Sequence, residues 1–489
     1  MKTSYMMGSL EAPLLQPAPA PAIEGCPGCM MEWRKANSNG RIPYKEFFFV
    51  GVTTLASALP ITCLFPFMYF MVRDFHIAKI EEDIGFYAGF LAASYMVGRA
   101  CGAIFWGVVA DYIGRKPVIV FSILSVVVLN TLFGLSTTYH MAIATRLVLG
   151  ALNGLLAPIK NSQAYCCEVC QTQHQALGLS VVNTAWGFGL IVGPALGGYL
   201  AQPAEKYPRI FSENSVFGRF PYLLPCLSVS TLSAVILISC TWLPETIHTH
   251  KCPKKEIIVV NLKPSKDGFF CDSPSKKSLL QNKPWISTVL PCCIFGLHDT
   301  AYSEVLSLWA VSNRKYGGLS FSTEDIGEVI SVAGAGLLVY QLFIYHWVHK
   351  ILGTINSSRI ASAISIIVLA TYPFMTYLSG VKLSLILCSA AMMKSALAIT
   401  VSTGINLLQN NAVCQEQRGT ANGILMTAIS FFKAIAPIGA GAIFSWAQKR
   451  QDAAFLPGDQ LVFVMLNLVE LLGLISTFKP FLVLPAQPE

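Results

Sequence analysis

Long apolar segments recur along the whole chain, and this feature limits the possible folds more than any other. A helix that crosses the hydrocarbon core of a bilayer needs about 20 mostly apolar residues. We expect such helices over residues 46–70, 84–106, 117–137, 139–160, 176–200, 219–242, 285–310, 325–348, 358–379, 383–407, 419–446 and 460–482. The sequence therefore predicts an all-α membrane protein with about 12 transmembrane helices.

The composition excludes most other classes of protein. Hydrophobic residues make up 54% of the 489 residues and charged residues only 12%, whereas a soluble globular chain carries roughly a quarter charged residues. The 15 cysteines are scattered rather than arranged as in a disulfide-stapled scaffold. The net charge of +8 lies mostly between apolar segments, which argues against nucleic-acid binding. No P-loop, dinucleotide-binding glycine run or nucleophile–base spacing is present, so we expect neither an enzyme nor an ATP-driven pump.

Lysine and arginine are distributed unevenly between the two sides of the predicted membrane. They gather in the segments that are cytosolic if the N-terminus is inside, above all in the middle segment, whose lysines are Lys251, Lys254, Lys255, Lys263, Lys266, Lys276, Lys277 and Lys283. Because short cytosolic loops are enriched in these residues, we expect both termini and the middle segment in the cytosol.

The grouping of apolar segments predicts two six-helix bundles. We divide the chain into a cytosolic N-terminal arm, a first bundle, a basic cytosolic linker, a second bundle and a short tail, over residues 1–43, 44–243, 244–283, 284–483 and 484–489. Similar glycine-rich sequences surround Pro194 and Pro437, which are 243 residues apart. Two related halves around a midplane site are typical of secondary transporters.

Three local motifs are distinctive. Residues 107–117 read Gly-Val-Val-Ala-Asp-Tyr-Ile-Gly-Arg-Lys-Pro, a pattern that suits a tight turn followed by a helix start. Arg146 begins an Arg-x-x-x-Gly-x-x-x-Gly run within the fourth segment; a buried arginine there faces a cavity or a counter-charge, or is a structural residue bonded to carbonyls. In the fifth segment, glycines spaced four apart share one helical face beside Pro194, which indicates close packing with a kink.

In this order and in these segments, the three motifs resemble those of the major facilitator superfamily. The resemblance implies that the loop motif latches the cytosolic ends of the halves, that Arg146 is linked to proton coupling, and that the glycine–proline motif belongs to antiporters. The gating candidates that it implies are Gly107, Asp111, Gly114, Arg115, Lys116, Gly189, Gly193, Pro194 and Gly197.

Finer features, spread over about residues 24–482, resemble the plant zinc-induced facilitator-like family. They are Cys26-Pro-Gly-Cys29, Glu168-Val-Cys170 with His174-Gln-Ala-Leu-Gly, and Leu243-Pro-Glu-Thr-Ile-His-Thr-His250. The resemblance implies export or vacuolar loading of zinc-related ligands such as nicotianamine and mugineic-acid phytosiderophores. It also implies proton-coupled movement of potassium or organic anions as an associated activity, in the vacuolar or the plasma membrane.

Two Cys-x-x-Cys pairs, Cys26/Cys29 and Cys167/Cys170, face the predicted cytosol. Disulfides are not expected in that reducing compartment. Four thiols can form a tetrahedral zinc site if the arm folds back onto the loop between the fourth and fifth helices. The alternative is that these cysteines are simply structural, and we expect no other cofactor.

Ionisable residues at membrane depth are functional candidates. Asp299 and Glu304 of the seventh segment lie about 140° apart on a helix, so they cannot share one narrow face. Our hypothesis is that Asp299 or Glu304 carries protons and that Arg146 tunes them. The candidate substrate-binding residues are Lys394, Lys433, His298 and Glu470, with the lysines holding carboxylates of an anionic or zwitterionic cargo. Internal salt bridges that only hold the bundle together are the alternative for each.

The expected partners are a small-molecule or ion substrate, protons and the lipid bilayer, for a chain that acts as a monomer by alternating access. A sugar or a drug-like cation is an alternative cargo. A non-transporting metal or redox sensor built on the cysteine arm is an alternative function.

Overall fold

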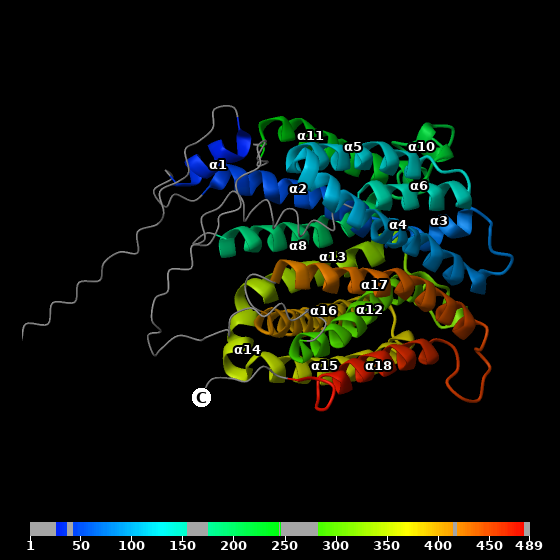
Figure 1. The fold of residues 1–489 in the computed structure, drawn as a ribbon. Helices are drawn as coiled ribbons and strands as arrows, with labels where there is room; N and C mark the ends of the chain where they lie inside the picture. Colours follow the sequence, from blue (N-terminus) through cyan, green and yellow to red (C-terminus); the bar gives the residue numbers. More distant parts are fainter. Residues whose placement is uncertain are drawn as a thin grey trace, which may run out of the picture.

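The computed structural model describes residues 26–36, 43–153, 175–243, 245, 282–413 and 418–483. These residues form helices joined by short connections, with no strand among them (Figure 1). This confirms the predicted all-α fold. Most of the basic linker lies outside the described residues.

The N-terminal half follows a short helix, α1 (Pro27–Ala36), and occupies the upper part of Figure 1. Its main helices are α2 (Tyr44–Thr62) with α3 (Met68–Asp74), α4 (Ile84–Ile113), α5 (Arg115–Gly134), α6 (Tyr139–Leu152), α8 (Gln175–Leu200) and α11 (Leu223–Ser239).

The C-terminal half occupies the lower part of Figure 1. Its helices are α12 (Lys283–Val311), α13 (Thr323–Val339), α14 (Tyr345–Leu352), α15 (Thr354–Thr371), α16 (Gly380–Asn411), α17 (Arg418–Gln448) and α18 (Asp459–Ser476). A π-helical turn over Tyr340–Ile344 joins α13 to α14. Every predicted apolar segment contains a helix, and 8 of the described helices are long and apolar enough to cross a membrane. The full count of crossings and the cytosolic position of the termini stay predictions.

The structure divides the first expected span, 46–70, into α2 and α3. Pro60 lies in the last turns of α2, and Pro66 lies in the break that follows. Proline lacks an N–H donor and clashes with the preceding turn, so the helix ends here. Carbonyl groups at the end of a helix have no partner along the chain, which leaves them free to bind other segments.

The motif at residues 107–117 is more helical than expected. Because α4 continues to Ile113 and α5 starts at Arg115, Gly114 alone forms the turn, with a φ of 104° that favours glycine. Gly353, with a φ of 73°, forms the corresponding turn between α14 and α15. Both halves therefore share the turn, although the surrounding motif is missing from the second half.

Among the described residues, two helix pairs make the most extensive contacts between the halves: α8 packs on α13, and α4 packs on α17. Glycines allow the backbones to approach, because a Cβ atom added at Gly198 would lie 3.0 Å from the Cα of Gly327, and one added at Gly89 would lie 3.2 Å from the Cα of Gly441. Small residues at helix interfaces are typical of packing in membranes.

The halves are tied together at one end of the molecule, at the right in Figure 1. We call it the outward end, because residues 201–218, 311–324 and 447–459, which connect expected spans on the outer side when the N-terminus is cytosolic, lie there. Hydrogen bonds at the opposite end, within the described part of the chain, join segments of the same half, for example from Lys116 Nζ to the Thr241 carbonyl and from Asn282 Nδ2 to the Ala412 carbonyl.

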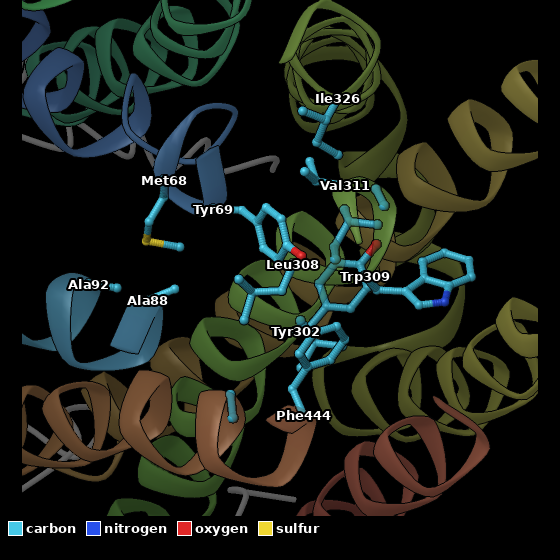
Figure 2. Packing of buried hydrophobic residues seen from close by; sticks show 14 of the residues in the cluster. Met68, Tyr69, Ala88, Ala92, Tyr302, Leu308, Trp309, Val311, Ile326 and Phe444 are labelled. Carbon is cyan, nitrogen blue, oxygen red and sulfur yellow. The ribbon is translucent and has the colours of Figure 1, made fainter. Parts of the chain in front are cut away.

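Buried apolar side chains fill the space between the halves near the outward end (Figure 2). Met68 and Tyr69 of α3 and Ala88 of α4 come from the N-terminal half, whereas Leu308 and Val311 of α12 come from the C-terminal half. Together with the contacts between the halves, this apolar plug closes the outward end.

We predict that Gly150→Ala lowers the stability of the purified protein by about 1–3 kcal/mol, because an added methyl group overpacks a tight interface. A Cβ at Gly150 would meet the Tyr95 carbonyl of α4 and lie 3.0 Å from the Arg99 nitrogen. The control is Gly439→Ala, where a Cβ meets nothing within 4 Å and alanine favours the helix. Thermal unfolding in detergent compares the two, and a G150A Tm at or above that of G439A would contradict this packing.

Candidate functional site

Glu304 of α12 faces the junction of the two halves. Only 1% of its surface is exposed, and its Oε1 atom has no hydrogen-bond partner within the described structure. Arg146 of α6, in the other half, is the charged group that acts on it electrostatically. Because a buried carboxylate without a bonded partner is unfavourable by several kcal/mol, the charge state of Glu304 is sensitive to any change in its surroundings.

Arg146 is 2% exposed and holds the end of α2. Its Nη1 donates to the Pro60 carbonyl at 2.8 Å, one of the groups that the end of the helix leaves free. The guanidinium lies 5.0 Å from the ring centre of Tyr95 and 5.3 Å from that of Phe133, within the range of cation–π attraction. Arg146 is therefore bonded to a carbonyl, as the structural interpretation expected, and its charge also acts on Glu304.

The break between α2 and α3 contacts both halves. The Ser307 hydroxyl of α12, one turn beyond Glu304, donates to the Phe65 carbonyl in the break. Arg146 and Ser307 thus bind carbonyls on either side of the same interruption, which places Glu304 and Arg146 near it. We call Glu304 and Arg146 the interface site.

A second charged group lies entirely inside the C-terminal half. Glu470 Oε2 is 3.0 Å from His298 Nε2 and 3.4 Å from Lys394 Nζ. Ser365 and Ser362 donate to the same carboxylate at 2.9 and 3.3 Å. The three ionisable side chains are 1–2% exposed. We call these five residues the buried charge cluster; with a neutral imidazole, its net charge is zero.

Sequence reasoning missed the polar neighbours of this cluster. Ser358, Ser362 and Ser365 fall on one face of α15, and that helical spacing was the available signal. Lys394 Nζ also lies 5.1 Å from the ring centre of Tyr302, whose hydroxyl bonds that of Tyr372 at 2.7 Å. Nothing in the sequence predicted that Tyr302 and Tyr372 lie near this cluster, because each is a single tyrosine within an apolar segment.

Asp299 and Lys433 are half-buried, unlike the buried charge cluster. Asp299 and Arg99 of α4 both act electrostatically on Lys433, and within the described structure no ion pair within 4.0 Å involves Lys433. The structure therefore brings three of the four predicted substrate ligands together and places Lys433 elsewhere. Their binding roles stay predictions.

The glycine face of α8 contacts α2, within the same half. A Cβ at Gly189, Gly193 or Gly197 would meet Ala58, Thr62 or Cys63 respectively. Pro194 lies inside the continuous helix α8. These residues are placed to hold α8 against α2, and their gating role stays a prediction.

Lys116 is fixed by the segment that follows α11. Its backbone N–H donates to Glu245 Oε2 at 3.1 Å, and a Cβ at Gly114 would meet the same carboxylate 2.7 Å away. Glu245 was not predicted as part of this motif. The side chains of Asp111 and Arg115 lie outside the described ones, as do the surroundings of Gly107, so the gating role of these residues stays a prediction.

The N-terminal arm docks on the N-terminal half. Met31 of α1 packs with Phe49 and Val50 of α2, and Cys26 is buried at the start of α1, with Cys29 partly buried. Cys167 and Cys170 lie outside the described residues. Among the described residues, no group of three or more His, Cys, Asp or Glu side chains could hold a metal ion, so the four-cysteine zinc site stays a prediction.

A helical fold of two joined halves with charged groups at their junction defines a membrane transporter. Residues 50–437 match the family model described as Major Facilitator Superfamily, and the chain belongs to this superfamily, whose members move small molecules across membranes. It is 51% identical over 462 residues to Protein ZINC INDUCED FACILITATOR-LIKE 1 of Arabidopsis thaliana, covering 94% of this chain and 96% of that protein.

Another Arabidopsis thaliana relative, described as a probable peptide/nitrate transporter, is 50% identical over 471 residues with the same coverage of both chains. The solved structure of a D-xylose–proton symporter shares the fold, with a TM-score of 0.67 at 13% identity over 89% of this chain and 97% of that one. The resemblance to the zinc-induced facilitator-like family is thereby confirmed.

We predict that Glu470→Gln destabilises the protein by about 3–5 kcal/mol, because it leaves Lys394 buried without its counter-charge. Adding Lys394→Gln to that variant should recover most of the loss, since no uncompensated charge then remains. Ser365→Ala is the control and should cost about 1 kcal/mol for one hydrogen bond. Equal Tm values for the single and double variants would contradict the pairing.

Proposed function

We propose that this transporter is a proton-coupled antiporter that exports or sequesters zinc-related small ligands, such as nicotianamine and mugineic-acid phytosiderophores, or organic anions and potassium. The proposal that transport is coupled to protons rests on the surroundings of Glu304. This buried carboxyl group has no bonded partner for its Oε1 atom within the described structure, and Arg146 of the other half acts on it electrostatically.

The contrast with Glu470 supports Glu304 as the proton carrier. Glu470 is balanced by Lys394 and held by His298 and two serines, so gaining or losing a proton would leave a net charge in a buried place. Among the described residues, Glu304 has no ion pair within 4.0 Å, and Arg146 is the charged group that acts on it. Burial opposes the charged form of a carboxylate and a guanidinium favours it, so a change in their separation changes the proton affinity.

Alternating access supplies that change. Glu304 and Arg146 belong to different halves, and rocking of the halves around a central site alters the distance between them and their exposure to water. A proton taken up from one side is then released to the other. Asp299, half-buried on another face of α12, is the second candidate carrier.

The cargo site we propose centres on Lys433, near Asp299 and Arg99. These groups offer both signs of charge, which suits an amino-carboxylate ligand better than a neutral sugar. The name of the 51% identical relative, Protein ZINC INDUCED FACILITATOR-LIKE 1, supports a link to zinc. We propose the vacuolar or the plasma membrane as its location, because a proton-coupled exporter needs an acidic compartment on the far side of the membrane.

We predict that Glu304→Gln in proteoliposomes abolishes the acceleration of transport by a pH gradient while exchange of cargo for cargo continues, because an amide cannot release a proton. Asp299→Asn should reduce the pH dependence less. Glu213→Gln, in an exposed loop, is the matched control and should behave as the unaltered protein. An unchanged pH dependence in both the Glu304 and the Asp299 variants would rule out the coupling assignment.

We also predict that nicotianamine and mugineic acid compete with each other for uptake, whereas a neutral sugar does not, when labelled nicotianamine, mugineic acid, zinc and potassium are compared in one preparation. Lys433→Gln should raise the KM for the amino-carboxylate ligands roughly tenfold or more, the cost of one charge-assisted contact. Lys382→Gln, an exposed lysine, serves as the control. An unaltered KM would remove Lys433 from the cargo site.

A further inference from the structure

In the described part of the chain, two lysine–carboxylate ion pairs cross between the halves at the outward end. Lys206 Nζ lies 3.5 Å from Glu324 Oε1, and Lys449 Nζ lies 2.6 Å from Asp83 Oδ1. Lys206 ends the short helix α9 (Pro203–Lys206), which follows α8, and Glu324 lies in the first turn of α13. Lys449 directly follows α17, and Asp83 directly precedes α4. Neither pair belongs to the interface site or to the buried charge cluster.

Lys206 is the more enclosed of the two lysines. Its side chain is 16% exposed, and its ammonium also donates to the Gly198 carbonyl and to Thr323 Oγ1. Thr323 in turn donates to the Gly198 carbonyl at 3.1 Å. Burial lowers the pKa of Lys206, and the neighbouring Glu324 opposes that shift. This group ties the outer ends of α8 and α13 together.

The second pair ties the outer ends of α4 and α17 in the same way. Asp83 Oδ1 accepts from Lys449 and, at 3.1 Å, from Ser445 of α17. Directly beyond Asp83, a Cβ at Gly85 would lie 2.6 Å from the ring of Phe444. The ion pair therefore lies at the end of a tightly packed helix contact.

The internal repeat relates the two lysines to each other. Lys206 and Lys449 are 243 residues apart, the same separation as Pro194 and Pro437. The helix contacts beneath them are also equivalent, because a Cβ at Gly327 would lie 2.8 Å from the Pro194 carbonyl and a Cβ at Gly89 would meet the Pro437 carbonyl. The two lysines thus occupy equivalent positions of the repeat, and each pairs with an acid near the start of a helix in the other half.

We infer that Lys206–Glu324 and Lys449–Asp83 are a pair of outward latches that set how often the outward end opens. Both lie at the helix pairs that join the halves, so opening of the outward end has to break them. A partly exposed ion pair shifts an equilibrium by about two- to fivefold, and independent pairs multiply their effects. Two such latches favour the state in which the outward end is closed, but they are weak enough for that end to open.

The inference is tested without any cargo, so its failure is distinct from failure of the proposed function. A carbodiimide joins a lysine amine to a carboxylate only where the two are in contact. Applied to the unaltered protein in membranes, it should yield cross-linked peptides that join residues 206 to 324 and 449 to 83, identified by mass spectrometry. Absence of both products would overturn the latches.

Hydrogen exchange then measures their effect on the equilibrium. Lys206→Glu and Lys449→Glu should each raise deuterium uptake at the outer ends of α4, α8, α13 and α17, with about a two- to fivefold larger open fraction, and should lower uptake at the inner ends. The charge-reversed doubles K206E/E324K and K449E/D83K should restore the original pattern. Lys382→Glu, an exposed lysine near the start of α16, is the control.

A merely structural role would raise uptake at both ends and would not be rescued by exchanging the charges. Unchanged uptake in both single variants, or doubles that behave as the singles do, would overturn the inference. If a single variant fails to fold, the cross-linking result on the unaltered protein decides.

Discussion

A charged side chain inside a bilayer has to be compensated by counter-charges and hydrogen bonds within the protein, and this constraint decides how the buried polar residues are arranged. The buried charge cluster meets it completely, because Glu470 is surrounded by His298, Lys394 and two hydroxyl groups. The interface site meets it only in part, since Glu304 depends on Arg146 in the other half. A balanced group stabilises one half as a unit, whereas a partly balanced group between halves responds when they move.

Interruption of a helix makes that interface possible. Inside a membrane, backbone groups freed by a broken helix must be bound by other parts of the protein. At the end of α2 they are bound by Arg146 at the Pro60 carbonyl and by Ser307 at the Phe65 carbonyl. The same break therefore positions Arg146 and connects α12 to the N-terminal half.

Contacts between the halves differ along the length of the molecule. At the outward end, glycine-rich helix pairs, the apolar plug and the outward latches hold the halves together, while hydrogen bonds at the inner end of the described chain remain within each half. Such a distribution suits a transporter whose halves rock, because the packing within each half is unaffected when the contacts between them are exchanged.

The sequence by itself determined the all-α membrane fold, the helix positions and the candidate charges at Arg146 and Glu304, because apolar length and intramembrane charge are local properties. It did not reveal the break in the first span, although Pro60 and Pro66 were its signals. Only the tertiary structure decided that His298 and Lys394 share one carboxylate while Lys433 lies apart. Pairing of that kind depends on the rotation of each helix against its neighbours, which arises from the packing of the whole bundle.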